Sequence, residues 1–172
     1  MSKLPTGLFR LDFAPLVTPT NGNSMDYNDE GDEENKMVKP IVKDVFFLGQ
    51  KSEPATKADL QVGRDLQDTL KAHRAECVGM AANMIGVKKN IIIVNMGFID
   101  VVMFNPVIVS KSEPFETEEG CLSLSGVRPC TRYQNIEVEY YDFNWKKQKT
   151  KLQGWTAQIA QHEIDHLSGK II

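Results

Sequence analysis

Hydrophobic residues recur at helical spacing in the segment that follows Lys57. Leu60, Val62, Leu66 and Leu70 fall near one face of a helix, and charged residues fall on the opposite face. This pattern is typical of an amphipathic helix that buries one side. A helix is therefore predicted across about residues 57–75.

Strand-like patterns fill the middle of the chain. Residues 91–95 (IIIVN) form a β-branched run, and residues 100–109 predict either a pair of strands or one strand with a bulge at Pro106. Residues 136–143 alternate between hydrophobic and polar types, and a turn at Asn144 leads to a polar strand over 146–152. This succession indicates antiparallel hairpins.

The last predicted element is a helix from about Trp155 to Leu167. It contains neither Pro nor Gly and stops just before Gly169, which is a favourable residue at a helix C-terminus. Together with the strands, it predicts an α+β domain in which antiparallel β-sheets pack around a buried C-terminal helix.

Charge divides the chain into two parts. The whole chain has 172 residues, 41% of them hydrophobic, and a formal net charge of -3, which suits one globular domain. Residues 1–36 contain seven acidic and three basic residues. We therefore expect an acidic, flexible N-terminal extension over 1–36 and a nearly neutral folded domain over 37–172. The lack of a broad basic surface argues against direct nucleic-acid binding.

The sequence has no recognisable membrane or export signal, since no apolar run approaches roughly 18 residues. A cytoplasmic protein that does not associate with membranes is the default expectation. A disulfide framework is not expected from three cysteines in such a chain. Each cysteine is then either a small buried residue or a ligand.

The most informative motif is HEIDH, which lies in the last predicted helix. His162 and His166 are four residues apart, so their imidazoles lie on the same face, one turn apart. Glu163 can reach a metal-bound water, as in the H-E-x-x-H motif of metal-dependent hydrolases. A helix that merely packs two histidines is the simpler alternative, but two of only three histidines around a glutamate favour a metal site.

Two histidines do not complete a catalytic metal site, which usually has three protein ligands and one position for water. No further histidine follows His166, so the third ligand is expected earlier in the chain. The segment EGCLS offers Cys121 for this role. Taken alone it is a weak indication, because a lone cysteine is more often a buried small residue.

Three segments in this order, CVGMAANM, EGCLS and QHEIDHLSGK, resemble the motifs of the peptide deformylases, and the last two are highly specific as a pair. The resemblance covers most of residues 38–172. It implies an α+β fold with antiparallel sheets around a C-terminal metal-binding helix. It also implies an enzyme that removes the N-formyl group from the N-terminal methionine of polypeptides.

The resemblance also implies a role for individual residues. Cys121, His162 and His166 are the expected metal ligands, and Glu163 is the expected general acid and base. The backbone N–H of Leu122 is expected to point at the developing oxyanion. The family usually works with Fe²⁺, although Zn²⁺ and Ni²⁺ also suit one Cys and two His ligands.

A second pair supports the metal site. In the family, the glutamate of the EGCLS motif meets an arginine that follows it in sequence, which corresponds here to Glu119 and Arg132. We expect a buried pair that fixes the ligand geometry, rather than a surface pair of little value.

The first motif departs from the family pattern Gly-x-Gly-Leu-Ala-Ala-x-Gln. Cys77 replaces the first glycine and places a second thiol near the expected site, and Met84 stands at the position of the glutamine. That glutamine donates a hydrogen bond to the oxyanion, which a thioether cannot do. Asn83 is not expected to substitute, because adjacent residues face different ways. Loss of one such donor typically costs on the order of 10²–10³ in turnover, so reduced or redirected activity is expected.

Substrate contacts are expected from Val78 and Gly79 in the first motif and from Gln158 and Ile159, which precede His162 on the helix. A solvent-facing Gln158 is an equal alternative. The expected partners are N-formylated nascent peptides, with a transient position near the ribosome.

Two alternatives to an active deformylase remain. A catalytically weak relative that binds metal or N-terminal peptides is favoured by Cys77 and Met84. A general zinc endopeptidase is disfavoured, because it would leave the EGCLS segment without a role.

Overall fold

A computed structural model describes residues 36–172, so the acidic extension expected over 1–36 lies outside the described residues apart from Lys36. The expected antiparallel strands form one five-stranded sheet with the order β1-β2-β3-β4-β5. The strands are β1 (Gly79–Ala81), β2 (Ile91–Asn95), β3 (Asp100–Gly120), β4 (Val127–Tyr141) and β5 (Lys147–Gln153). The helices are α1 (Val45–Leu48), α2 (Leu60–Ala72) and α3 (Gly154–Leu167), with 3₁₀ turns η2 (Lys57–Asp59) and η3 (Ala82–Ile85).

Strand β2, which lies between β1 and β3, is buried on both faces. Ile93 packs in one hydrophobic cluster with Leu66 of α2, and Ile92 packs in the other with Ile159 of α3. A strand covered on two sides can consist of apolar residues without alternation, which explains the run IIIVN. The amphipathic helix predicted over 57–75 is confirmed, although its α-helical part is limited to Leu60–Ala72.

The long strand β3 continues through Pro106. Its pairing with β4 shifts register between Phe104 and Val107, and Asn105 there has a φ of 52°. The prediction of a bulged strand is therefore right and that of a strand pair is wrong. The Asn105 side chain makes the irregularity tolerable, because it accepts from the Ala55 backbone N–H at 2.7 Å and donates to the Ala55 carbonyl at 2.9 Å.

The partner strand β4 begins at Val127, earlier than the alternation over 136–143 predicts. Exposure alternates along its first half, but the more buried positions include Arg128 and Arg132, so hydrophobicity does not mark this part of the strand. The edge strand β5 confirms the polar strand predicted over 146–152. Its Lys147 and Lys149 form ion pairs with Glu139 and Glu137 of β4.

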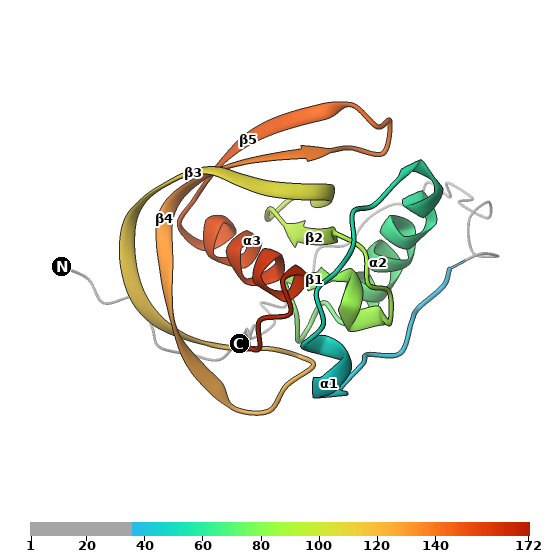
Figure 1. Cartoon of the computed structure of the whole chain (residues 1–172), viewed down its shortest axis with the longest axis horizontal. Helices are drawn as coiled ribbons and strands as arrows, with labels where there is room; N and C mark the ends of the chain where they lie inside the picture. Colours follow the sequence, from blue (N-terminus) through green and yellow to red (C-terminus); the bar gives the residue numbers. More distant parts are fainter. Residues whose placement is uncertain (1–35) are drawn as a thin grey trace, which may run out of the picture.

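The C-terminal helix α3 lies inside the curve of β3 and β4 (Figure 1). Nine of its fourteen residues are buried, which confirms the predicted buried helix. No helix within residues 36–172 is long and apolar enough to cross a membrane. The helix ends against the turn after α1, where Gly169 has a φ of 77° and a Cβ on it would lie 2.4 Å from the Gly49 carbonyl oxygen.

We expect Gly169→Ala to lower the free energy of unfolding by about 2–4 kcal/mol, since it adds left-handed strain and a backbone clash. Gly97→Ala is the matched control, because Gly97 also has a positive φ but nothing lies within 4 Å of its Cβ position. Its cost should be about 1 kcal/mol. Urea denaturation of the metal-free proteins measures both. Equal losses would show that the contact with Gly49 is unimportant.

Candidate active site

Two histidines of α3 present their Nε2 atoms to a common point. His162 and His166 lie one turn apart, and their Nε2 atoms are 3.1 Å from each other. Both side chains are almost completely buried. The expectation that the HEIDH spacing brings the two imidazoles together is therefore met in the structure.

Cys121 approaches the same point from the end of β3. Its Sγ lies 3.3 Å from His166 Nε2, and the three ligand atoms of Cys121, His162 and His166 lie within 4.8 Å of one another. A tetrahedral ion with ordinary bonds to nitrogen and sulfur would separate its ligand atoms by roughly 3.4–3.6 Å. The donor set and its spacing thus fit a divalent metal with two nitrogen ligands and one sulfur ligand.

The Glu119 carboxylate holds His162 by its other ring nitrogen, Nδ1. One of its oxygens, Oε2, accepts from His162 Nδ1 at 2.8 Å and from Arg132 Nη2 at 2.7 Å. The other, Oε1, accepts from Arg132 Nε at 2.9 Å and from Gln158 Nε2 at 2.9 Å. Because His162 Nδ1 is engaged with Glu119, its Nε2 is the nitrogen left to face the point shared with Cys121 and His166. The expected buried pair of Glu119 and Arg132 is confirmed.

The charges in this cluster follow from burial and these contacts. Burial alone would raise the pKa of Glu119, but hydrogen bonds from His162 and Arg132 outweigh it and lower the pKa to about 2. Burial alone would lower the pKa of His162, yet its contacts with Cys121 and Glu119 raise it to about 10. Burial, together with the charge of His162, lowers the pKa of His166 to about 3. Of the two imidazoles, His162 is therefore the one that favours a proton.

Glu163 is buried beside the two histidines. Burial raises its pKa to about 7, and its Oε2 has no hydrogen-bond partner within the described residues. Strand β1 lies against it, since a Cβ on Gly79 would be 2.8 Å from Glu163 Oε1 and 2.7 Å from Ile159 Cγ2. Glycine at position 79 is thus what allows the strand to approach the carboxylate. Val78, the preceding residue, is buried in the cluster that includes Ile159.

The substituted positions of the first motif lie next to this site. Met84 is buried in the hydrophobic cluster against which Cys121 and Leu122 pack. The Cys77 thiol lies 2.7 Å from the Gly79 carbonyl oxygen, and burial followed by the charge of Glu163 raises its pKa to about 12. Asn83 donates to the His166 carbonyl at 3.0 Å. Its amide nitrogen therefore holds the end of α3.

Gln158 does not face solvent. It is 9% exposed, and its amide nitrogen binds Glu119. The alternative of a solvent-facing Gln158 is therefore wrong. Sequence reasoning also missed Asp165, whose Oδ2 accepts from Arg132 Nη1 at 2.6 Å. Its position three residues after His162 on the helix is the only signal, and it does not reveal a partner on another strand.

A cavity of about 280 Å³ adjoins the segment that follows Cys121. Its lining residues are Lys43, Val45, Leu122, Ser123, Leu124, Ser125 and Arg128. Within the described residues the Leu122 backbone N–H has no hydrogen-bond partner.

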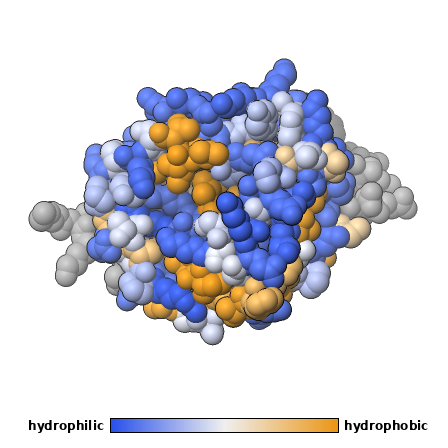
Figure 2. Space-filling model, in the orientation of Figure 1, coloured by the Kyte–Doolittle hydropathy of each residue, from blue (hydrophilic) through white to orange (hydrophobic). Residues whose placement is uncertain are grey.

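Figure 2 shows a mostly hydrophilic face with hydrophobic patches, one of them along the lower edge where α1 lies. In α1, Phe46 is 82% exposed.

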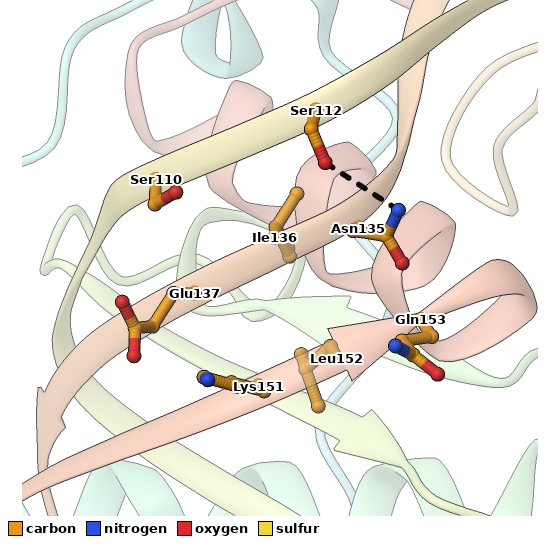
Figure 3. Close-up of a pocket in the computed structure, with 8 residues that line it drawn as sticks. All are labelled: Ser110, Ser112, Asn135, Ile136, Glu137, Lys151, Leu152 and Gln153. Atoms are coloured by element: carbon orange, nitrogen blue, oxygen red, sulfur yellow. Dashed lines mark hydrogen bonds between the residues drawn. The ribbon is translucent and has the colours of Figure 1, made fainter.

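Figure 3 shows a separate hollow of about 270 Å³ among β3, β4 and β5. Polar side chains such as Ser112 and Asn135, which are hydrogen-bonded at 3.4 Å, line it. None of its lining residues belongs to the cluster around the two histidines. The chemistry of the HEIDH helix is therefore not located in this hollow.

Comparison with known proteins agrees with the geometry. A sequence model of the polypeptide deformylase family matches residues 38–172. The chain is a member of this family. A peptide deformylase from Clostridium beijerinckii is 59% identical over 136 residues, which is 79% of this chain and all of the relative. Peptide deformylases are metal-dependent hydrolases that remove the N-formyl group from N-terminal methionine, and this is the activity of the chain.

Solved peptide deformylases share the fold. A class I type b enzyme from Acinetobacter baumannii superimposes with a TM-score of 0.71 at 31% identity, covering 78% of this chain and 97% of that one. The same enzyme with Met-Ala-Ser bound gives a TM-score of 0.69 at 29% identity, with coverages of 78% and 96%. The α+β deformylase fold expected from the sequence is thereby confirmed.

We expect Arg132→Met to lower the free energy of unfolding by roughly 3–5 kcal/mol, because it leaves the buried Glu119 carboxylate without its main partner. Thermal or urea denaturation of the metal-free protein measures the loss. The control is Lys149→Met, which removes the ion pair between Glu137 and a lysine side chain that is 52% exposed. Its effect should stay below about 1 kcal/mol. A similar small loss for both variants would contradict the stabilising role of the buried pair.

Proposed function

We propose that Cys121, His162 and His166 hold the catalytic metal and that Glu163 is the general acid and base of deformylation. The observation that carries this proposal is the convergence of one sulfur and two imidazole nitrogens beside a buried carboxylate with a free oxygen. Fe²⁺ is the proposed native metal, and Zn²⁺ and Ni²⁺ suit the same ligands.

A divalent metal in this site would supply Lewis-acid activation of water and of the formyl carbonyl. Glu163 takes a proton from the attacking water at Oε2 and returns it to the departing amine. This role suits a carboxylate whose pKa is raised to about 7. The free backbone N–H of Leu122 is proposed to donate to the developing oxyanion. Glu119 keeps His162 in the tautomer that presents Nε2.

We further propose that Met84 lowers turnover relative to relatives that carry glutamine. Met84 is buried in the hydrophobic cluster against which Cys121 and Leu122 pack, but it offers no N–H donor. The Asn83 amide nitrogen is engaged with the His166 carbonyl and does not replace the missing donor. The metal, the Leu122 N–H and Glu163 would remain to carry out the reaction.

The proposed substrate is the formylated N-terminus of a nascent peptide. The bound Met-Ala-Ser of the Acinetobacter enzyme supports a peptide that presents an N-terminal methionine. Val78, Gly79 and Ile159 are proposed to line its path, because β1 and α3 enclose Glu163. A cytoplasmic location near the ribosome follows from this substrate, with residues 37–172 as the catalytic domain and 1–36 as an acidic extension.

Glu163→Gln should lower kcat by about 10²–10⁴-fold while the protein still binds one metal per chain. Formate release from a formyl-methionyl peptide and metal analysis measure the two properties. Turnover that survives the substitution would remove Glu163 from the mechanism.

In the unmodified enzyme, Glu163 must be deprotonated to act as a base, so kcat/KM should fall as the pH is lowered through the pKa of Glu163. The charge of the metal favours the carboxylate, so the midpoint should lie below the metal-free pKa of about 7. Formate release across this pH range measures the midpoint.

Met84→Gln should raise turnover by up to about 10²-fold, because it returns a donor to the position next to the reacting carbonyl. Met84→Leu is the matched control: it fills similar volume without a donor and should bring no gain. Formate release with a series of N-acyl methionyl peptides is the measurement. No gain from the glutamine would favour the alternative of a weak relative that binds metal or peptides.

A further inference from the structure

Gln158 lies one turn before His162 on α3 and is nearly buried, at 9% exposure. Its amide nitrogen donates to Glu119 Oε1 at 2.9 Å. The nitrogen end of the amide is therefore directed at a carboxylate behind the metal ligands. This contact differs from a substrate contact, for which the donor would have to face the peptide.

Glu119 receives donors from two elements. Arg132 of β4 donates to both carboxylate oxygens, whereas Gln158 and His162 of α3 donate to one oxygen each. Arg132 thus fixes the carboxylate relative to the sheet. The two donors of α3 fix it relative to the helix that carries the histidines.

The position of Glu119 affects two of the proposed ligands, Cys121 and His162. It precedes Cys121 by two residues at the end of β3, and it binds His162 Nδ1 directly. A shift of the carboxylate would therefore move the sulfur ligand and turn the His162 imidazole. If Gln158 were removed, Oε1 would lose its bond to α3 and keep the bond from Arg132, which belongs to the sheet.

We propose that Gln158 is a positioning residue, which holds Glu119 against α3 so that Cys121 and His162 keep their spacing around the metal. This proposal rests on the ligand set given under Proposed function. It assigns the Gln158 amide nitrogen to the metal site rather than to substrate recognition.

The test compares Gln158→Met with the unmodified protein, both loaded with Co²⁺. Methionine has a similar length and no donor. Substitution of a residue that is hydrogen-bonded to a metal ligand typically lowers metal affinity by about 10–100-fold. Gln158 contacts such a residue, Glu119, rather than a ligand, so its loss should accelerate Co²⁺ release to a chelator by a smaller factor, up to about tenfold. The Co²⁺ ligand-field bands should shift, and kcat should fall with little change in KM.

Gln161→Met is the matched control. Gln161 is a second buried glutamine of α3, but its amide binds only backbone groups of Tyr133 and Ala157. This variant should lower the melting temperature and leave the Co²⁺ bands and the release rate unchanged. If Gln158→Met does not fold, Gln158→Asn replaces it, since the shorter amide cannot keep the same bond and should show the same changes to a smaller extent.

An unchanged spectrum and release rate in the Gln158 variants, with a raised KM, would overturn the positioning role in favour of a substrate contact. Absence of a thiolate-to-cobalt band in the unmodified protein is a different result. It would overturn the assignment of Cys121 as a ligand, and this proposal with it.

Discussion

The buried Glu119 carboxylate is the interaction on which the site depends. It joins β3, β4 and α3, because its donors come from Arg132 of β4 and from Gln158 and His162 of α3. A carboxylate that is 1% exposed is costly without such partners. With them its pKa falls to about 2, so it stays charged and keeps His162 oriented. Pairing of β3 with β4 and the placement of His162 are therefore coupled.

The parts of the site that follow from local periodicity could be predicted from the sequence. His162 and His166 converge because α-helical spacing places them on one face. The role of Cys121 could not be obtained from spacing, since its approach to the helix depends on the curvature of β3. The need for a third ligand indicates Cys121 only weakly, and the resemblance of EGCLS to a known motif strengthens that indication.

Contacts between distant elements account for most of what the sequence did not predict. Gln158 has the same helical spacing whether it faces solvent, substrate or Glu119, and only the packed structure distinguishes these cases. The start of β4 at Val127 was missed for a related reason. Its first residues are paired with β3 by backbone hydrogen bonds but are little buried, so hydrophobicity does not mark them. The bulge at Pro106 was one of two alternatives from the sequence, because a proline that cannot donate to the ladder either interrupts a strand or bulges it, and the pairing of β3 decides between them.

The ion pairs along β5 have a consequence for contacts between molecules. β5 is an edge of the sheet, with one side of its backbone unpaired by any strand of the described chain. Lys147, Lys149 and Lys151 alternate along it and are all exposed. Pairing of this edge with the same edge of another molecule would bring lysines close to lysines, which is unfavourable. The exposed lysines of this edge strand thus discourage growth of the sheet by self-association.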